Sequence, residues 1–320
     1  MTDQKVLYLP DSVLESLGLG PSDIADSIEA AFAAQAQGQL WTVPKSAIMP
    51  GDGRYMMTTL SVSDAPQFTV IKTATVSPRN PDRGLNGIEA AIILLDSETG
   101  LLRAVMGGNW ITATRTAALS AVMGRRLANP ESRSIAIVGC GVQARSHLDA
   151  FAAEFPISEI RMLGRGQANI DRLSAKAKAM GLSCLHAENA QQAIEGADIV
   201  VSSITLSYDT APFLDAHWLK PGAFAAITDL GIPWIQDSLV ALDHAYIDDH
   251  AQEASSPKPM IASQLIKGDM AQVLSGDVKA KFDPTRSAAF LFRGMAIGDY
   301  AAAALAYQHA LDTEAGTTLN

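Results

Sequence analysis

The stretch SIAIVGCGVQARSHLDAF, residues 134–151, runs from an apolar segment through two glycines into a helix-favouring segment. It contains the pattern G-x-G-x-x-A, which spans Gly139, Gly141, Val142, Gln143 and Ala144. The first glycine of this pattern permits a tight turn, the second lets the backbone approach a pyrophosphate, and the small third residue lets helix and strand pack closely. Free N–H groups at the helix start favour phosphates. Because the pattern lies between a predicted strand and a predicted helix, it predicts a dinucleotide site; the alternative is a turn without a ligand.

Strand-like and helix-like segments alternate around this turn. Apolar, β-favouring runs occupy residues 134–139, 159–164, 183–187, 198–204, 223–230 and 244–249. Their alternation with helical segments predicts a parallel sheet with helices on both faces. The preceding part of the chain mixes helices, expected at 11–17, 21–39 and 110–127, with strands at 55–62, 67–76 and 89–96. A last helix at 294–312 is expected to be amphipathic and to pack on the N-terminal part.

Composition and charge argue against several classes of function. The 320-residue chain is 48% hydrophobic and 18% charged, as is typical of a globular protein. A net charge of −10 argues against nucleic acid or an anionic membrane as a partner. The cysteines, Cys140 and Cys184, lack metal-ligand spacing, so we expect no metal site and a reducing, cytoplasmic location. We recognise neither a signal peptide nor an apolar run of about 18 residues, and therefore expect no membrane span.

The end of the second strand of a dinucleotide-binding domain distinguishes NAD from NADP. NAD sites usually place Asp or Glu there for the ribose hydroxyls, whereas NADP sites often place Arg near the 2′-phosphate. This chain has Gly164, Arg165 and Gly166 at that point and no acid. Arg165 could therefore pair with a 2′-phosphate, or it could stack on adenine or face solvent. The sequence favours NADP(H) or dual use, and the choice between NADH and NADPH stays open.

Six segments carry a resemblance to a known family. The most specific is GNWITATRTAALSAV at 108–122, and the others lie at 70–80, 138–147, 196–204, 219–231 and 294–303. In their order and spacing they resemble the ornithine cyclodeaminase/mu-crystallin family over essentially the whole chain. Members of that family depend on NAD(P), act on amino acids, keto acids or imines, and are mostly homodimers. The resemblance therefore implies an NAD(P)-dependent oxidoreductase that acts on CH–NH2 or CH–NH groups and forms a homodimer.

The resemblance and the pattern of segments imply the same fold class, α/β. A Rossmann-type doubly wound parallel sheet at residues 126–294 is expected to be inserted into an α+β substrate-binding and dimerisation domain. That second domain is expected to comprise residues 1–125 and 295–320.

Two cations are assigned to the substrate by the resemblance. Lys72 and Arg115 match the family residues that hold the substrate carboxylate, and Thr116 is expected at the pyrophosphate. Two cations that converge on one small anion can orient it, and an arginine can bind it bidentately. The alternatives are a solvated edge lysine for Lys72 and an ion pair within the domain for Arg115.

Asp229 is the predicted proton-transferring residue. It lies at the carboxyl end of an apolar strand, where ligands meet a doubly wound sheet, and it matches a family aspartate. An aspartate beside the nicotinamide could stabilise a protonated imine or move a proton to or from its nitrogen. The alternative is a capping or turn aspartate. We also expect Ser203, Thr205, Asp229 and Leu230 to contact the cofactor.

Other positions depart from the family pattern. Lys45 replaces an arginine that is common there, and it keeps the charge but loses the bidentate geometry; it is expected to help Lys72 and Arg115 hold the carboxylate. Tyr55 replaces a glutamate suited to the distal amine of ornithine, which argues against ornithine cyclisation. Arg54 and Arg293 are additional candidate cations that would suit a second carboxylate, as in iminosuccinate. The alternative for Arg293 is that it faces cofactor or solvent.

The predicted function is NAD(P)H-dependent reduction of a small 2-imino acid to an L-amino acid, or the reverse dehydrogenation. The predicted partners are a small imino or oxo acid and a second copy of the chain. Two alternatives stay open: an ornithine cyclodeaminase proper, and a non-catalytic mu-crystallin-like protein that binds NADPH and a small carboxylate.

Overall fold

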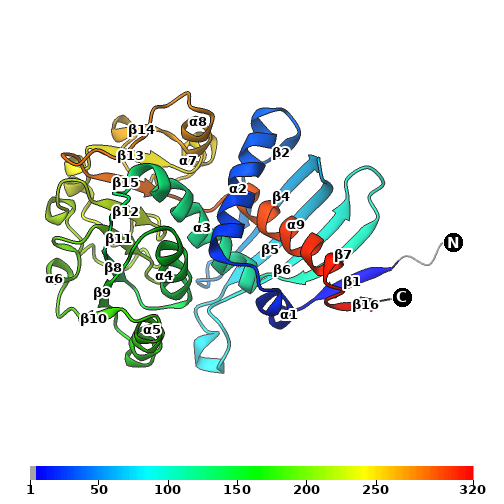
Figure 1. Cartoon of the computed structure of the whole chain (residues 1–320), viewed down its shortest axis with the longest axis horizontal. Coiled ribbons are helices and arrows are strands. Elements are labelled where there is room, and N and C mark those ends of the chain that lie inside the picture. The colour runs from blue at the N-terminus through cyan, green and yellow to red at the C-terminus, as the bar shows by residue number, and fades with distance from the viewer. Residues whose placement is uncertain (1–4, 320) are drawn as a thin grey trace. The chain divides into compact units, whose positions relative to one another are not determined.

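The computed structural model describes residues 5–319, which fall into two compact units (Figure 1). Unit 1 comprises Met1–Arg115 and Met295–Asn320, and unit 2 comprises Thr116–Gly294. The first boundary lies within helix α3 (Asn109–Leu127), earlier than the boundary expected at residue 125. The second half of α3 belongs to unit 2 because its small residues Ala117 and Ala121 pack with Ala150 of that unit.

Unit 1 is built on an eight-stranded sheet with the order β16-β1-β7-β6-β5-β4-β2, in which β3 also pairs with β4. Neighbouring strands are antiparallel except for β1 and β7. The strands are β1 (Val6–Leu9), β2 (Leu40–Thr42), β3 (Ser46–Ile48), β4 (Tyr55–Asp64), β5 (Gln67–Val76), β6 (Ile88–Asp96), β7 (Leu102–Gly107) and β16 (Thr317–Leu319).

One face of this sheet is covered by helix α9 (Ala296–Asp312), which packs on β4, β5 and β6 (Figure 1). Helix α2 (Pro21–Ala36) packs on α9 in turn, and α1 (Asp11–Ser16) contacts β1 and β7. A short 3-10 turn, η1 (Pro81–Arg83), lies in the loop before β6. The expected amphipathic character of the last helix is wrong: most of α9 is buried, because α2 covers the side turned away from the sheet.

Unit 2 is built on an eight-stranded sheet with the order β10-β9-β8-β11-β12-β15-β13-β14, and every neighbouring pair is parallel. The strands are β8 (Ser134–Val138), β9 (Glu159–Leu163), β10 (Ser183–His186), β11 (Ile199–Ser202), β12 (Phe224–Ile227), β13 (His244–Ile247), β14 (Ile266–Asp269) and β15 (Ala288–Leu291). This is the doubly wound order with β15 inserted next to β12. Neither β14 nor β15 was expected, since no regular helix leads directly into β15 to mark the alternation.

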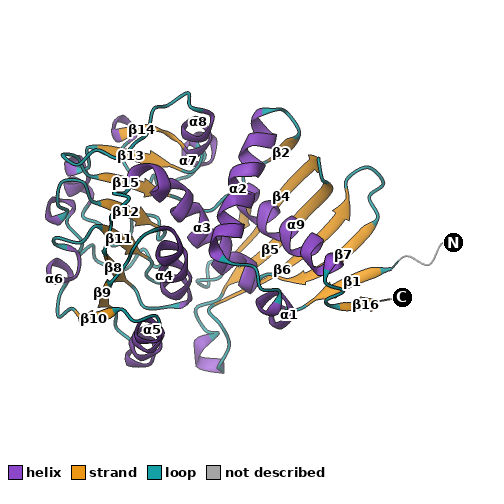
Figure 2. Ribbon diagram, in the orientation of Figure 1, coloured by secondary structure: helices purple, strands orange, loops and turns teal. Residues whose placement is uncertain are grey.

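Helices flank this sheet on both sides, with α4 and α5 on one side and α6 on the other (Figure 2). The helices of unit 2 after α3 are α4 (Val142–Glu154), α5 (Gln167–Ala179), α6 (Ala190–Ile194), α7 (His250–Ala254) and α8 (Met270–Ser275). The short 3-10 helices are η2 (Ala216–Trp218), η3 (Gln236–Ala241) and η4 (Ser263–Leu265). The predicted fold class, a doubly wound parallel sheet inserted between two chain ends that form an α+β unit, is confirmed. Within the described residues, no helix is long and apolar enough to cross a membrane.

The register of the unit 2 sheet aligns the carboxyl ends of its central strands. Val138 of β8 pairs with Ser202 of β11, which pairs with Ile227 of β12, and Leu291 of β15 continues the row. Each of these residues is the last of its strand, so the segments that follow them emerge along one edge. In doubly wound sheets this carboxyl edge is where ligands bind.

Candidate active site

The glycine-rich turn after β8 is held by the two strands beside β8. Gly139 adopts φ +95°, and a Cβ built on it would lie 2.5 Å from the carbonyl oxygen of Ser203. Its N–H donates to the carbonyl of Leu163 at 2.8 Å, and the Ser203 hydroxyl donates to the Gly139 carbonyl at 3.2 Å. Only glycine satisfies both this backbone conformation and this close approach.

Gly141 has the opposite environment, which leaves room for a ligand. A Cβ built on it would meet no atom within 4 Å, so packing inside the protein does not require a glycine here. It is the N-cap of α4 and supplies no side-chain cap to the first N–H groups of that helix. Ala144 is buried and allows α4 to approach the sheet. Open space beside a helix start without a side-chain cap fits the pyrophosphate of a dinucleotide.

Asp229 follows β12 at the same carboxyl edge and is 1% exposed. Its Oδ1 accepts from the Ser202 hydroxyl at 3.0 Å, and its Oδ2 accepts from the N–H of Ile204 at 3.1 Å. Trp234 in turn donates its indole N–H to the Ser202 hydroxyl at 3.0 Å. Leu230 has φ +60°, so the chain turns sharply directly after the aspartate.

Burial raises the pKa of Asp229 to about 6, although its hydrogen bonds with Ile204 and Ser202 oppose that rise. The partners of the carboxyl group are neutral donors, which stabilise its charge less than a cation does. A carboxyl group with a pKa of about 6 can both give and accept a proton near neutral pH.

In unit 1, one buried carboxylate joins the two cations predicted to bind substrate. The Nζ of Lys72 lies 2.6 Å from Oδ1 of Asp299, and the Nε of Arg115 lies 2.8 Å from the same oxygen. The Thr59 hydroxyl donates to Oδ2 of Asp299 at 2.9 Å. Lys72 and Asp299 are each 1% exposed, so Lys72 is not a solvated edge lysine.

Strand register and α9 together assemble this cluster. Thr59 of β4 and Lys72 of β5 are direct partners across the two strands, and α9 brings Asp299 over them. Asp299 and Thr59 were not predicted. A signal for Asp299 was present, since it is a single acid in the otherwise apolar segment GMAIGDYAAA.

The Lys72–Arg115–Asp299 cluster contains more positive than negative charge. Two buried cations face one buried carboxylate, which leaves one positive charge over. The Nε of Arg115 is within ion-pair distance of Asp299 but lacks hydrogen-bond geometry; its Nη1 is also buried without an acceptor among the described residues. The cluster can therefore accept one further anion, and a carboxylate suits a guanidinium.

The protonation states follow from these neighbours. Burial, and then the charge of Arg115, lower the pKa of Lys72 to about 8, while Asp299 opposes the change. Burial alone would raise the pKa of Asp299, but Arg115 and Lys72 outweigh it and lower that pKa. At pH 7 the cluster thus keeps both of its cations and its carboxylate.

Lys45 and Tyr55 lie together at the edge of this region. The Nζ of Lys45 is 6.0 Å from the centre of the Tyr55 ring, and its charge contributes to lowering the pKa of Lys72. The position that suits an ornithine amine in cyclodeaminases thus holds an aromatic ring beside a cation. A second amine cation would have no carboxylate partner from Tyr55.

Arg54, expected as an additional substrate cation, already has a local partner. Its Nε lies 2.7 Å from Oδ2 of Asp52, and both side chains are largely exposed. A cation that a neighbouring acid neutralises in an exposed loop attracts a substrate weakly. The structure does not support a substrate-binding role for Arg54.

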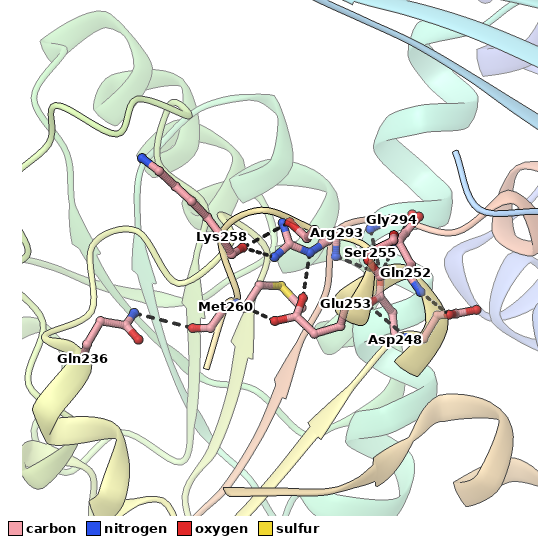
Figure 3. A network of polar contacts seen from close by, with 11 residues as sticks. Gln236, Asp248, Gln252, Glu253, Ser255, Lys258, Met260, Arg293 and Gly294 are labelled. Atoms are coloured by element: carbon pink, nitrogen blue, oxygen red, sulfur yellow. Dashed lines mark hydrogen bonds and ion pairs between the residues drawn. The ribbon is translucent and has the colours of Figure 1, made fainter. Parts of the chain in front are cut away.

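Arg293 is likewise engaged within unit 2 (Figure 3). Its Nε lies 2.7 Å from Oε2 of Glu253, both side chains are buried, and its guanidinium also donates to the Lys258 carbonyl. Asp248 accepts from the N–H groups of Arg293 and Gly294 at 2.8 and 3.0 Å. Arg293 was expected as a spare cation for a second carboxylate, or as facing cofactor or solvent; in the structure its charge is paired with the buried Glu253.

The other expected cofactor residues lie along the carboxyl edge of the unit 2 sheet or in α3. Val142 and Gln143 begin α4, Ser203 and Thr205 follow β11, Arg165 follows β9, and Thr116 is a buried residue of α3. Among residues 5–319, no group of three or more His, Cys, Asp or Glu side chains could hold a metal ion.

The fold and the open glycine turn define a dinucleotide-binding protein of the Rossmann class. The chain matches the model of the ornithine cyclodeaminase/mu-crystallin family over residues 6–314, and it belongs to that family. The resemblance inferred from the sequence motifs is thereby confirmed.

Individual relatives extend over most of the chain. The ketimine reductase mu-crystallin of Mus musculus is 34% identical over 223 residues, which cover 68% of this chain and 69% of the mouse protein. The Δ1-pyrroline-2-carboxylate reductase of Thermococcus litoralis, in complex with NADH and L-proline, superposes with a TM-score of 0.89 at 24% identity, covering 98% of this chain and 100% of that one. An archaeal alanine dehydrogenase dimer with bound NAD gives a TM-score of 0.87 at 22% identity, covering 99% of each chain. Family membership and the dinucleotide turn confirm the prediction of an NAD(P)-dependent oxidoreductase.

Proposed function

We propose that the protein reduces a small 2-imino acid to an L-amino acid with NAD(P)H, or runs the reverse oxidation. The observation that carries the proposal is the buried Lys72–Arg115–Asp299 cluster, whose surplus positive charge matches one carboxylate. Support comes from relatives whose names describe the reduction of ketimines and of pyrroline-2-carboxylate.

Lys72 and Arg115 suit the substrate carboxylate, and two contacts to one carboxylate fix the orientation of the neighbouring C=N bond. A protonated Asp229 suits the transfer of its proton to the imine nitrogen, which leaves the carbon electron-poor. The bound dinucleotide supplies the hydride to that carbon. The C=N bond thereby gains one hydride and one proton and becomes CH–NH, and Asp229 is left as a carboxylate.

Arg54 and Arg293 each form an ion pair with an acid of this chain, and this favours a substrate with a single carboxylate. Both cations that could have held a second carboxylate are neutralised, by Asp52 and by Glu253. We therefore rank cyclic ketimines and the imines of monocarboxylic oxo acids above iminosuccinate. Ornithine cyclisation ranks lower because Tyr55 offers no anion, and a purely binding role leaves the raised pKa of Asp229 without a use.

The test is to follow reduced nicotinamide absorbance with a panel of substrates. Pyrroline-2-carboxylate, ammonium with pyruvate or glyoxylate, and ammonium with oxaloacetate separate the substrate classes. We expect turnover with a monocarboxylate. The matched variant Arg115→Lys keeps the charge and loses the bidentate geometry, so it should raise KM by about 10-fold or more. Turnover with oxaloacetate alone would contradict the ranking, and tight cofactor binding without any turnover would favour the binding protein.

We also propose that unit 1 mediates a homodimer. The sheet face opposite to α9 exposes apolar side chains on several strands, namely Tyr8, Trp41, Leu60 and Ile93. A sheet face that exposes large apolar side chains is typical of an interface between subunits. Leu60→Glu combined with Ile93→Glu should convert a dimer into a monomer in light scattering, whereas Val240→Glu, at an exposed apolar residue of unit 2, should not.

A further inference from the structure

We propose that this protein selects NADPH over NADH, and that Gly164, Arg165 and Cys140 set the selection. The proposal deepens the proposed function, since it concerns the dinucleotide site of the same enzyme. It rests on the space and the charge at the end of strand β9.

The segment after β9 lies directly beside the glycine-rich turn. The carbonyl of Leu163, the last residue of β9, accepts the N–H of Gly139 at 2.8 Å. Gly164 and Arg165, which follow Leu163, therefore lie next to the start of the glycine-rich turn. In a dinucleotide site, this end of the second strand faces the ribose of the adenosine half.

A carboxylate side chain at Gly164 would have to displace the side chains that fill the space beside it. A Cβ built on Gly164 would lie 2.8 Å from the Sγ of Cys140 and 3.2 Å from the Cγ1 of Ile170. The backbone of Gly164 is not in the left-handed region, so this glycine is needed for space and not for conformation. The side chain that NAD sites use to accept hydrogen bonds from the ribose hydroxyls is sterically excluded here.

Cys140 occupies the space without adding negative charge. It is buried in the turn, and burial raises the pKa of its thiol to about 11, so it stays neutral at physiological pH. The ribose end of the site thus lacks both the usual carboxylate and a thiolate that could repel a phosphate.

Arg165 supplies a positive charge at the next position. It is exposed, and no acid among the described residues forms an ion pair with it. The nearest acid of the following helix in sequence, Asp171, accepts from Gln167 at 2.7 Å. An exposed arginine can bind the 2′-phosphate of NADPH through charge-assisted hydrogen bonds, whereas NADH offers it only a hydroxyl. The crowded space at Gly164, which disfavours an acid, and the cation at Arg165 both favour NADPH.

The test measures binding by calorimetry and does not depend on turnover. We expect the wild type to bind NADPH at least about 10-fold more tightly than NADH, and 2′,5′-ADP more tightly than 5′-AMP. Arg165→Ala should remove most of both preferences while changing the NADH dissociation constant by less than about 2-fold. The control is Arg172→Ala, which removes a cation of the following helix, α5, whose side chain donates to Asn169, and it should keep both preferences.

A second pair of variants tests the steric part. Gly164→Asp alone should gain no affinity for NADH, because the new side chain meets the Cys140 sulfur. Adding Cys140→Ala removes the closest atom, and the double variant should bind NADH more tightly than Gly164→Asp does. Circular dichroism checks that both variants are folded, and the Arg165 series decides the proposal if they are not.

Equal affinity of the wild type for the two dinucleotides would overturn the selection proposal, as would unchanged preferences in Arg165→Ala. Either result leaves the proposed reductase intact. Failure to bind NADPH, NADH and 2′,5′-ADP alike would instead remove the basis of the proposed function.

Discussion

Two aspartates with the same burial behave in opposite ways in the two units. Asp299 and Asp229 are each 1% exposed, yet the pKa of Asp299 is lowered and that of Asp229 is raised to about 6. Burial raises the pKa of both, so the difference comes from their partners. Asp299 contacts two cations and a hydroxyl, whereas Asp229 contacts a hydroxyl and a backbone N–H. The first arrangement fixes a charge for binding, and the second leaves a proton free to move.

The largest expected effect is a loss of kcat when Asp229 can no longer transfer a proton. Asp229→Asn should lower kcat by about 10²- to 10⁴-fold, because an amide cannot exchange the proton. The dissociation constant of NADPH, measured by calorimetry, should change little. A variant with near-normal kcat would show that the imine nitrogen receives its proton from another group.

The free energy of unfolding should depend more on Asp299 than on Asp229. Asp299→Asn leaves two buried cations without a counter-charge, so the free energy of unfolding should fall by about 3 kcal/mol. Asp229→Asn should change it much less, because the amide removes a disfavoured buried charge and its oxygen can still accept from the Ile204 N–H. Urea unfolding of both variants gives the comparison. Equal losses would mean that the cations in unit 1 are better solvated than their burial indicates.

The pH dependence of the reaction should show two transitions, one from Asp229 and one from Lys72. Reduction needs protonated Asp229, so kcat should fall as the pH rises through about 6, and oxidation of the amino acid should rise through the same range. Carboxylate binding needs protonated Lys72, so KM should rise as the pH passes about 8. Full pH profiles in both directions test this. The transition near 6 should vanish in Asp229→Asn, and a transition that persists there belongs to another group.

The smallest expected effect concerns a cation outside the Lys72–Arg115–Asp299 cluster. Arg54→Ala should change KM by less than about 2-fold, because its guanidinium is exposed and paired with Asp52. Steady-state kinetics should compare the KM of Arg54→Ala with that of Arg115→Lys. A large rise in KM for Arg54→Ala would restore the role first expected for Arg54.

The sequence predicted those features that short-range patterns encode. The turn at Gly139 and Gly141 has a local reason, since strand, glycines and helix start are consecutive in the chain. Asp229 could be found because it ends an apolar strand, and Lys72 and Arg115 were assigned through the family motifs that contain them. Strand β15 was missed because an irregular segment separates it from the short helix α8. The helical pattern of α9 could not reveal that α2 covers its other side.

The sequence alone predicted the fold class and the dinucleotide turn, and the family resemblance singled out the cations proposed for the substrate. Only the tertiary structure decided which charges are neutralised. Asp299 meets Lys72 across 227 positions of the chain, and Glu253 meets Arg293 across 40. A motif fixes what a side chain can do, but its pKa and its availability depend on neighbours that folding brings from distant segments. For this reason the sequence offered five candidate cations for the substrate, and in the structure Lys72 and Arg115 are the two that share one buried carboxylate.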